Sequence, residues 1–184
     1  MKEYMTHGEV LALLREGMDI KNWVSKDAPL WHSKAKKMWR KMWIRCYDPT
    51  NSRYNSYINS IIFNDFRYFS NFIKWLESQP RFEEFCSTCH EVSWCIDKDM
   101  KKVGNKNYYP EYMTLCTKSE NQVDRCKRYS KAVRGISLID NSTILFNFLN
   151  ESEKLGFNPG HISECCQGKR NTHKGYKWEY VKED

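Results

Sequence analysis

The clearest local signals of the chain lie in one segment, Leu155-Gly-Phe-Asn-Pro-Gly-His-Ile-Ser-Glu-Cys-Cys-Gln-Gly-Lys-Arg-Asn-Thr-His-Lys-Gly-Tyr-Lys-Trp178. Asn158 followed by Pro159 is typical of a helix start, because an asparagine side chain caps the first turn and proline fits the first helical position. A shorter helix, capped at Asn150 and ending at Gly156, is expected before it. Two short helices joined by a tight turn that contains glycine predict a helix-turn-helix.

Short strands are expected on both sides of this segment. Residues 137–140 and 143–148 are β-prone and flank Asn141-Ser142, which predicts a hairpin. Residues 176–180 alternate aromatic and charged side chains, which predicts a closing strand. We therefore expect a compact C-terminal module over 136–184, preceded by a basic linker over 124–135.

The N-terminal half is expected to be helical. Thr6 and Glu9 have capping-box spacing before an apolar run, so a helix is expected to start there and to end at Gly17. Residues 31–46 place Trp and Met on one face and lysines on the other, and residues 65–78 place Phe, Ile and Leu on one face. The chain contains 7 Trp, 11 Tyr and 9 Phe, and their helical spacing indicates a packed core in preference to a cofactor site.

Basic residues outnumber acidic ones by 30 to 23 in these 184 residues, and they are clustered. Residues 31–47 contain six basic side chains and no acid, including Arg40 and Arg45, and two further basic clusters lie at 98–134 and 168–178. Cationic clusters interleaved with aromatics suit a phosphate backbone, so we expect Arg40 and Arg45 to contact DNA; solvated surface faces are the alternative. No apolar run reaches the roughly 18 residues of a membrane helix, and no signal peptide is evident, so a soluble protein without a membrane partner is expected.

The chain contains eight cysteines, a number that indicates metal ligands or buried thiols in a reducing compartment. Cys86 and Cys89 have the spacing of a zinc half-site. Cys116 or His90 would complete a structural Zn²⁺ site, although Cys116 and Cys126 do not form a second Cys-x-x-Cys pair. Buried packing thiols are the alternative.

The segment Leu155–Trp178 resembles the intron-encoded nuclease repeat, a helix-turn-helix module of phage and intron homing endonucleases. The similarity rests on Ile162-Ser163, Gly168-Lys169-Arg170, His173-Lys174-Gly175-Tyr176 and Trp178. The resemblance implies double-stranded DNA as partner and a helix from Asn158 that enters a groove. The side chains that it implies at phosphates or base edges are Asn158, His161, Ser163, Lys169, Arg170, His173 and Lys174.

Residues from about 39 to 120 are similar to phage HNH-type endonucleases. The similarity rests on Trp39-x-x-Met42-x-x-Arg45-Cys46-Tyr47-Asp48, Tyr54-x-x-Tyr57, Phe69-x-x-Phe72-x-x-Trp75, Ile96-Asp97-Lys98-Asp99, Gly104-Asn105-Lys106 and Tyr109-Pro110-Glu111. The resemblance implies an α+β fold: a helical segment over 1–30, a small ββα-metal nuclease domain over 31–123, and a C-terminal ββ-helix-turn-helix-β module. In that family a strand ends in Asp-His, where histidine is the general base and aspartate holds a divalent ion.

This sequence departs from the family at the expected histidine, where Lys98 stands between Asp97 and Asp99. We expect Asp97 and Asp99 to hold Mg²⁺ or Mn²⁺, with Lys98 or His90 in the catalytic role. A lysine is a poor base at neutral pH unless burial lowers its pKa, and alternating carboxylates converge only if the strand bends. A charged strand end with a local ion pair is the alternative. Further candidate ligands are Asn105, Asn107, Glu111 and Asn121.

Three functions are compatible with these patterns. The first is a metal-dependent DNA endonuclease of homing type, which acts as a monomer on an asymmetric site in the cytoplasm of an infected bacterial host. The second is a nuclease-derived DNA-binding or regulatory protein that has lost cleavage. The third is an interaction protein that binds a host or phage protein through its aromatic N-terminal half.

Overall fold

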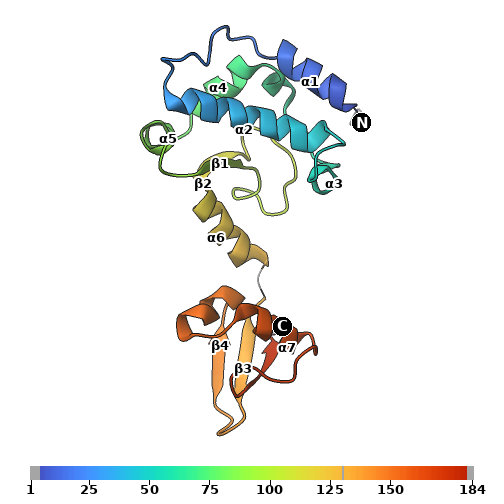
Figure 1. Ribbon diagram of the computed structural model, residues 1–184, viewed down its shortest axis with the longest axis vertical. Helices are drawn as coiled ribbons and strands as arrows, with labels where there is room; N and C mark the ends of the chain where they lie inside the picture. The colour runs from blue at the N-terminus through green and yellow to red at the C-terminus, as the bar shows by residue number, and fades with distance from the viewer. Residues whose placement is uncertain (1–4, 130, 182–184) are drawn as a thin grey trace. The chain divides into compact units, whose positions relative to one another are not determined.

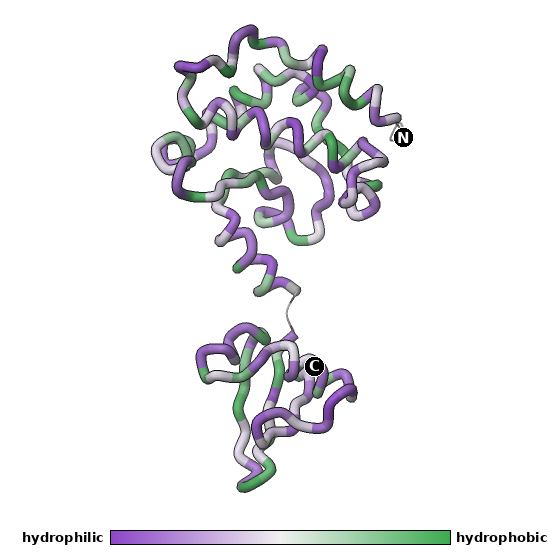
Figure 2. Tube along the Cα trace, in the orientation of Figure 1, coloured by the Kyte–Doolittle hydropathy of each residue, from purple (hydrophilic) through white to green (hydrophobic). Residues whose placement is uncertain are grey.

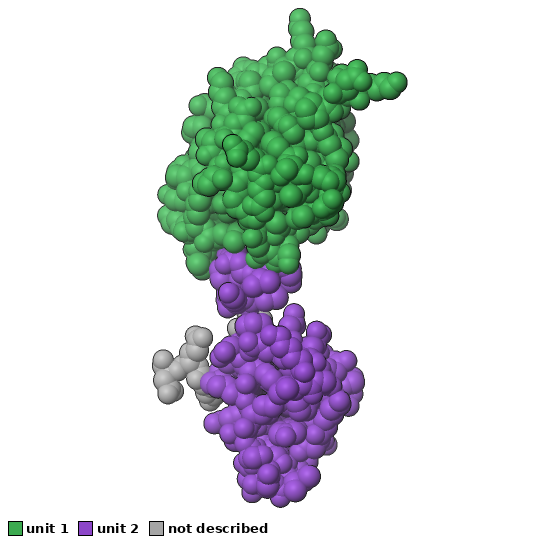
Figure 3. Space-filling model, turned by 90° about the vertical axis from the view of Figure 1, so that its left-hand side faces the viewer, with its two compact units in different colours: residues 1–121 green, residues 122–184 purple. Residues whose placement is uncertain are grey.

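The computed structural model describes residues 5–129 and 131–181 and shows a mixed α+β protein, which confirms the predicted fold class (Figure 1). The chain divides into two compact units, residues 1–121 and 122–184 (Figure 3). None of the helices within the described ranges is long and apolar enough to span a bilayer. In chain order the elements are α1 (His7–Glu16), α2 (Leu30–Tyr47), α3 (Tyr54–Tyr57), η1 (Asn64–Arg67), α4 (Phe69–Glu77), α5 (Phe82–Thr88), β1 (Trp94–Asp97), β2 (Thr114–Thr117), α6 (Lys118–Tyr129), β3 (Val133–Ser137), β4 (Thr143–Phe146), η2 (Leu149–Leu155), α7 (Pro159–Cys166) and β5 (Tyr176–Tyr180).

Helix α1 starts as the sequence predicts, with a complete capping box. The Glu9 backbone N–H donates to Thr6 Oγ1 at 3.3 Å, and the Thr6 backbone N–H donates to the Glu9 carboxylate at 2.7 Å. These two bonds satisfy backbone donors that an uncapped helix end leaves free. The helix then buries Val10 and Leu14 in the core of the first unit.

The core of the first unit is built around α2 and its aromatic face. Trp39, Met42 and Trp43 are buried there, and the indole N–H groups of Trp39 and Trp43 both donate to the Phe66 carbonyl, at 2.7 and 3.1 Å. Phe69 and other aromatic side chains of this half are also fully buried. Most of the aromatic side chains that suggested a protein partner are therefore buried in the core of the first unit.

The single helix expected over 65–78 is split into η1 and α4, and the extended backbone at Tyr68 separates them. In one continuous helix the Phe66 carbonyl would accept from the Ser70 N–H. Instead that carbonyl accepts the two tryptophan N–H groups, while the Ser70 N–H donates to Asp19 Oδ1 at 2.9 Å. Long-range hydrogen bonds thus replace the helical one.

A strand–strand–helix arrangement begins in the first unit, and its helix, α6, continues past the unit boundary at residue 121. Strands β1 and β2 are antiparallel, with Cys95 opposite Cys116 and Asp97 opposite Thr114. Helix α6 follows β2 directly and is mostly hydrophilic (Figure 2). Its start is capped, because the Glu120 N–H donates to Thr117 Oγ1 at 3.1 Å.

The segment predicted as a basic linker, 124–135, contains part of a helix and the start of a strand. Residues up to 129 belong to α6, and β3 begins at Val133. The helix continues because its start is capped and because Asp124 and Arg128 form an i,i+4 ion pair one turn apart. The connection between α6 and β3 is therefore much shorter than the sequence indicates.

The second unit contains a three-stranded antiparallel sheet in the order β4-β3-β5. The predicted hairpin is present, but β3 ends at Ser137 and residues 138–140, expected in the strand, belong to the turn. The first strand therefore lies earlier in the chain than expected. Gly135 is the central residue of β3, and a Cβ atom there would lie 2.8 Å from both Trp178 and Ile144. Glycine is required because the indole of Trp178 packs directly over the strand.

The connection between η2 and α7 contains the predicted glycine and the predicted asparagine cap. Gly156 adopts a left-handed conformation with φ of 76°, which glycine tolerates best, and Asn158 Oδ1 accepts the His161 N–H at 3.1 Å. The expected short helix is present as the 3₁₀ helix η2, but it starts at Leu149, so the predicted cap Asn150 lies inside it. Helix α7 buries Ile162 and Cys165 against the sheet, in the same core as Trp178.

Candidate functional site

Asp97 lies at the end of β1, where its carboxylate turns the chain. Its Oδ1 accepts the backbone N–H groups of Asp99 and Met100 at 2.8 and 2.7 Å, and the residue is 8% exposed. Burial raises the pKa of Asp97, and the adjacent Asp99 carboxyl raises it further. The bend needed to bring the two carboxyl groups together is therefore present.

Lys98, which stands where the resemblance to HNH endonucleases led us to expect a histidine, is held inside the same loop. Its Nζ donates to the Asn105 carbonyl at 3.0 Å and lies 3.9 Å from Asp99 Oδ2. It also lies 5.8 Å from the centre of the Tyr57 ring. The amino group is thus positioned beside the carboxylates, with one of its hydrogen bonds already used by the backbone.

Asn105 fastens this loop to the end of β1. Its Nδ2 donates to the carbonyls of Lys98 and Asn107, and its Oδ1 accepts the Asn107 N–H at 3.2 Å. The Asn107 side chain in turn accepts the Ile61 N–H at 3.0 Å. These asparagines were candidate metal ligands by sequence proximity, and in the structure their side chains hold the loop.

Asn121 of helix α6 contacts strand β1 at Cys95, two residues before Asp97. Asn121 Nδ2 lies 3.5 Å from Cys95 Sγ, and the sulfur atoms of Cys95 and Cys116 lie 3.8 Å apart across the two strands. The hydrogen bond from the Cys116 thiol lowers the pKa of Cys95 to about 7, and the same contact raises that of Cys116. Neither cysteine had been assigned to this neighbourhood from sequence.

His90 lies in the turn after α5, with Nε2 3.1 Å from Glu91 Oε1 and its side chain 53% exposed. Within the described residues, no hydrogen bond or ion pair joins it to Asp97 or Lys98. The structure therefore pairs the predicted alternative base with its own neighbour and not with the carboxylates.

The zinc site expected from Cys86, Cys89 and Cys116 is not assembled. Across residues 5–129 and 131–181, no group of three or more His, Cys, Asp or Glu side chains could hold a metal ion. Cys86 belongs to α5 and Cys89 follows that helix, so this pair lies at a helix end. Cys116 lies on β2, opposite Cys95 of β1. Burial raises the pKa of Cys86 to about 11, which favours the thiol over the thiolate that zinc requires.

Arg45 and Arg40, both expected to contact DNA, have different surroundings. The Arg45 guanidinium lies 5.4 and 5.5 Å from the ring centres of Tyr57 and Tyr108. Its Nε is buried and has no hydrogen-bond partner among the described residues. This packing argues against a phosphate contact at Arg45. Arg40 instead lines an open groove between α1, α2 and the intervening loop.

That groove, which we call the basic groove, is lined by four cations and no acid. The cations are Arg15, Lys21, Lys36 and Arg40, and Trp23 lies among them. In the part of the chain that the structure describes, none of the four forms an ion pair with a carboxylate. Unpaired cations that converge on one concave surface are suited to phosphate groups.

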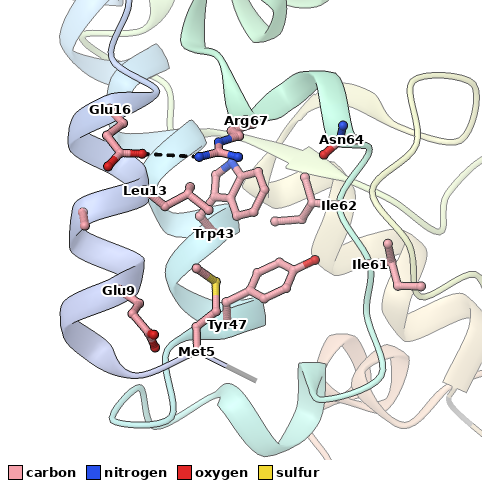
Figure 4. Close-up of a pocket in the computed structure, with 11 residues that line it drawn as sticks. Met5, Glu9, Leu13, Glu16, Trp43, Tyr47, Ile61, Ile62, Asn64 and Arg67 are labelled. Carbon is pink, nitrogen blue, oxygen red and sulfur yellow. Dashed lines mark hydrogen bonds and ion pairs between the residues drawn. The ribbon is translucent and has the colours of Figure 1, made fainter. Parts of the chain in front are cut away.

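A second groove between α1, α2 and residues 61–67 has the opposite character (Figure 4). Glu9 and Glu16 lie on its rim, and its one arginine, Arg67, pairs with Glu16 at 3.3 Å. Its floor includes Trp43 and Tyr47. Because its carboxylates would repel phosphate, this groove is a poor match for nucleic acid.

In the C-terminal unit, several residues expected at DNA have structural roles. Asn158 caps α7, and its backbone N–H donates to His173 Nε2 at 3.1 Å. Burial lowers the pKa of His173, and the nearby His161 adds to this, which keeps Nε2 available as an acceptor. Ser163 Oγ lies 3.2 Å from the Tyr180 hydroxyl. These groups stabilise the module itself.

The basic edge of the module is exposed but partly neutralised. Residues 168–171 are all exposed. Arg170 pairs with Glu164 at 3.0 Å, and Lys174 Nζ donates to the Gly156 carbonyl at 2.6 Å. Among the described side chains, Lys169 has no acidic partner. Lys169 is thus the member of the predicted set that is freest to meet a phosphate.

The chain is distantly similar to a solved HNH homing endonuclease. That structure describes DNA binding and cleavage by the HNH homing endonuclease I-HmuI. The two sequences are 20% identical, the match covers 54% of this chain and 67% of that one, and the TM-score is 0.30. No family model matches the chain, and no curated protein matches it.

Proposed function

We propose that this chain is a DNA-binding protein with a metal-dependent nuclease site at the end of β1. The observation that carries the proposal is the bend at Asp97-Lys98-Asp99, which brings two carboxyl groups together at the mouth of a loop fastened by Asn105. The bend belongs to a strand–strand–helix arrangement of β1, β2 and α6. This is the arrangement expected of an HNH-type centre.

Two carboxylates fit Mg²⁺ or Mn²⁺ better than zinc. Mg²⁺ is commonly held by one or two carboxylates, with water and substrate phosphate oxygens as the other ligands, whereas structural zinc needs four protein ligands. Asp97 and Asp99 would hold the ion. When bound, it would neutralise charge that develops on a scissile phosphate.

The protein's own groups supply the remaining parts of the site. Lys98 Nζ, 3.9 Å from Asp99, adds positive charge beside the carboxylates where a phosphate would approach. We assign duplex binding to the basic groove of the first unit and to Lys169 of the second. One copy of each surface on a single chain fits a monomer on an asymmetric site.

A second candidate function is DNA binding without cleavage. The observation that favours it is the engagement of Lys98 by the Asn105 carbonyl, together with the pairing of His90 with Glu91. In that case neither residue is free to accept a proton from water. The carboxylates would then be a remnant of a nuclease site in a DNA-binding or regulatory protein.

Supercoiled plasmid with Mg²⁺ or Mn²⁺ separates the two functions. Asp97→Asn is the informative variant, because an asparagine Oδ1 still accepts the N–H groups of Asp99 and Met100 while the charge is lost. We expect nicking by the wild type, none by Asp97→Asn, and equal gel-shift affinities. Glu153→Gln, an exposed site in the other unit, serves as the control and should nick normally.

Each alternative outcome has a defined meaning. A gel shift without nicking by the wild type supports the second function. If the wild type neither binds nor nicks DNA, both functions are wrong. If Asp97→Asn nicks as fast as the wild type, the assignment of the site to Asp97 is wrong even though the protein is a nuclease.

A further inference from the structure

Strands β1 and β2, next to the candidate metal centre, carry two cysteines whose thiols face each other. Cys95 on β1 and Cys116 on β2 are direct cross-strand partners, and their sulfur atoms lie 3.8 Å apart. Both are free cysteines. Cys116 is 3% exposed, whereas Cys95 is only partly buried.

This placement matches what a disulfide requires. Directly opposed residues of antiparallel strands have Cα atoms about 4.5–5.5 Å apart, inside the range of about 4.4–6.8 Å that disulfides span. The sulfur atoms, now 3.8 Å apart, need to approach to about 2.05 Å. The register of β1 and β2 is thus already that of the cross-linked form.

Two other pairs of cysteines, which are close in sequence, lack this cross-strand arrangement. Cys86 and Cys89 lie at the end of α5, and the Cys89 thiol donates to the Cys86 carbonyl at 3.8 Å instead of facing the other sulfur. Cys165 and Cys166 are consecutive residues of α7. Asn121, in contrast, directs an amide N–H at Cys95 Sγ and orients that sulfur in the pair.

We propose that Cys95 and Cys116 are a modification site that accepts oxidising equivalents and forms a reversible intrachain disulfide. With glutathione disulfide as the oxidant, the more accessible Cys95 sulfur attacks first, so that a bond forms between Cys95 and one glutathione while the other leaves as a thiol. The Cys116 sulfur then attacks Cys95 and releases the second glutathione. The protein loses two electrons and two protons, and glutathione disulfide gains them.

The cross-link would tie β1 to β2 two residues before Asp97. It constrains the unfolded chain, in which residues 95 and 116 would otherwise separate, so the oxidised first unit resists unfolding more than the reduced one. Formation of the bond does not depend on nuclease activity or DNA binding. Failure of the proposed function would therefore leave this inference intact.

The full chain is incubated with glutathione disulfide under native conditions and is then unfolded in urea with N-ethylmaleimide, so that buried free thiols are also blocked. The digest is analysed by mass spectrometry. We expect a peptide pair linked through Cys95 and Cys116, with the other cysteines alkylated. Dithiothreitol should abolish the linked pair. The oxidised wild type should also melt several degrees above the reduced form.

Variants sharpen the test. Cys116→Ala, a small apolar replacement for a buried thiol, should stop at the mixed disulfide of Cys95 with glutathione and show no gain in melting temperature. Cys126→Ser, on α6, should behave as the wild type and serves as the control. The proposal is overturned if Cys95 and Cys116 are both alkylated in the oxidised native protein, or if the linked peptides join other cysteines.

Discussion

Removal of two cations from the basic groove should weaken DNA binding and make the affinity less dependent on salt concentration. The double variant Lys36→Ala, Arg40→Ala deletes half of the four cations that line the groove. Both side chains lie on α2, a helix whose buried face uses other residues, including Trp39 and Met42. The fold should therefore persist while the phosphate-binding surface loses charge.

The size of the effect follows from counterion release. Each neutralised phosphate of duplex DNA contributes about 0.9 to the slope of log affinity against log salt, so two lost contacts reduce the slope by about 1.8. Between 50 and 200 mM salt, a difference of this size changes the affinity ratio of wild type to variant by roughly tenfold. The ratio is largest at low salt.

Fluorescence anisotropy with a labelled duplex, measured at several salt concentrations, gives the slopes directly. Arg67→Ala is the matched control, because Arg67 is an exposed cation of the same unit that Glu16 already neutralises in the other groove (Figure 4). The control should keep the wild-type slope. An unchanged slope in the double variant, or an equal loss in both variants, would refute the assignment of the groove to phosphate.

Three further predictions concern stability. Gly135→Ala should destabilise the second unit by about 1–3 kcal/mol in thermal unfolding, because the new methyl group would lie 2.8 Å from Trp178; a neutral result would contradict the close packing. Although burial acts in the opposite direction, hydrogen bonds from Thr50 and His7 hold the pKa of Asp48 below its usual value. The ionised Asp48 therefore stabilises the folded protein above the unfolded-state pKa of about 4, and this contribution is lost as the pH falls below that value. Asp48→Asn should flatten the pH dependence of the unfolding free energy in this range, measured by urea unfolding. Trp39→Phe removes an N–H donor to a buried carbonyl and part of a buried ring, so it should cost about 2–3 kcal/mol in urea unfolding, and a cost near zero would show that the bond is dispensable.

Local sequence was sufficient where the deciding contacts join residues within a few positions. The capping box of Thr6 and Glu9 and the asparagine cap of α7 were predicted and are present. The closing strand at Tyr176–Tyr180 was predicted too. In each case the hydrogen bonds or alternation that specify the element are short-range, so the sequence alone contains the necessary information.

Boundaries set by distant partners were not predictable. The break at Tyr68 depends on Trp39 and Trp43, which take the Phe66 carbonyl out of a continuous helix. The start of β3 at Val133 depends on pairing with β4 and β5. Neither effect leaves a signal in the neighbouring sequence.

The same division applies to the candidate site. The sequence identified Asp97, Lys98 and Asp99 and the basic clusters, because residue type and spacing are visible in one dimension. Only the tertiary structure decided that the two carboxyls converge, that Arg45 is enclosed by tyrosines, and that four cations share one groove. Whether a charge is neutralised depends on which side chains fold against it, and that is a property of three-dimensional packing and not of composition.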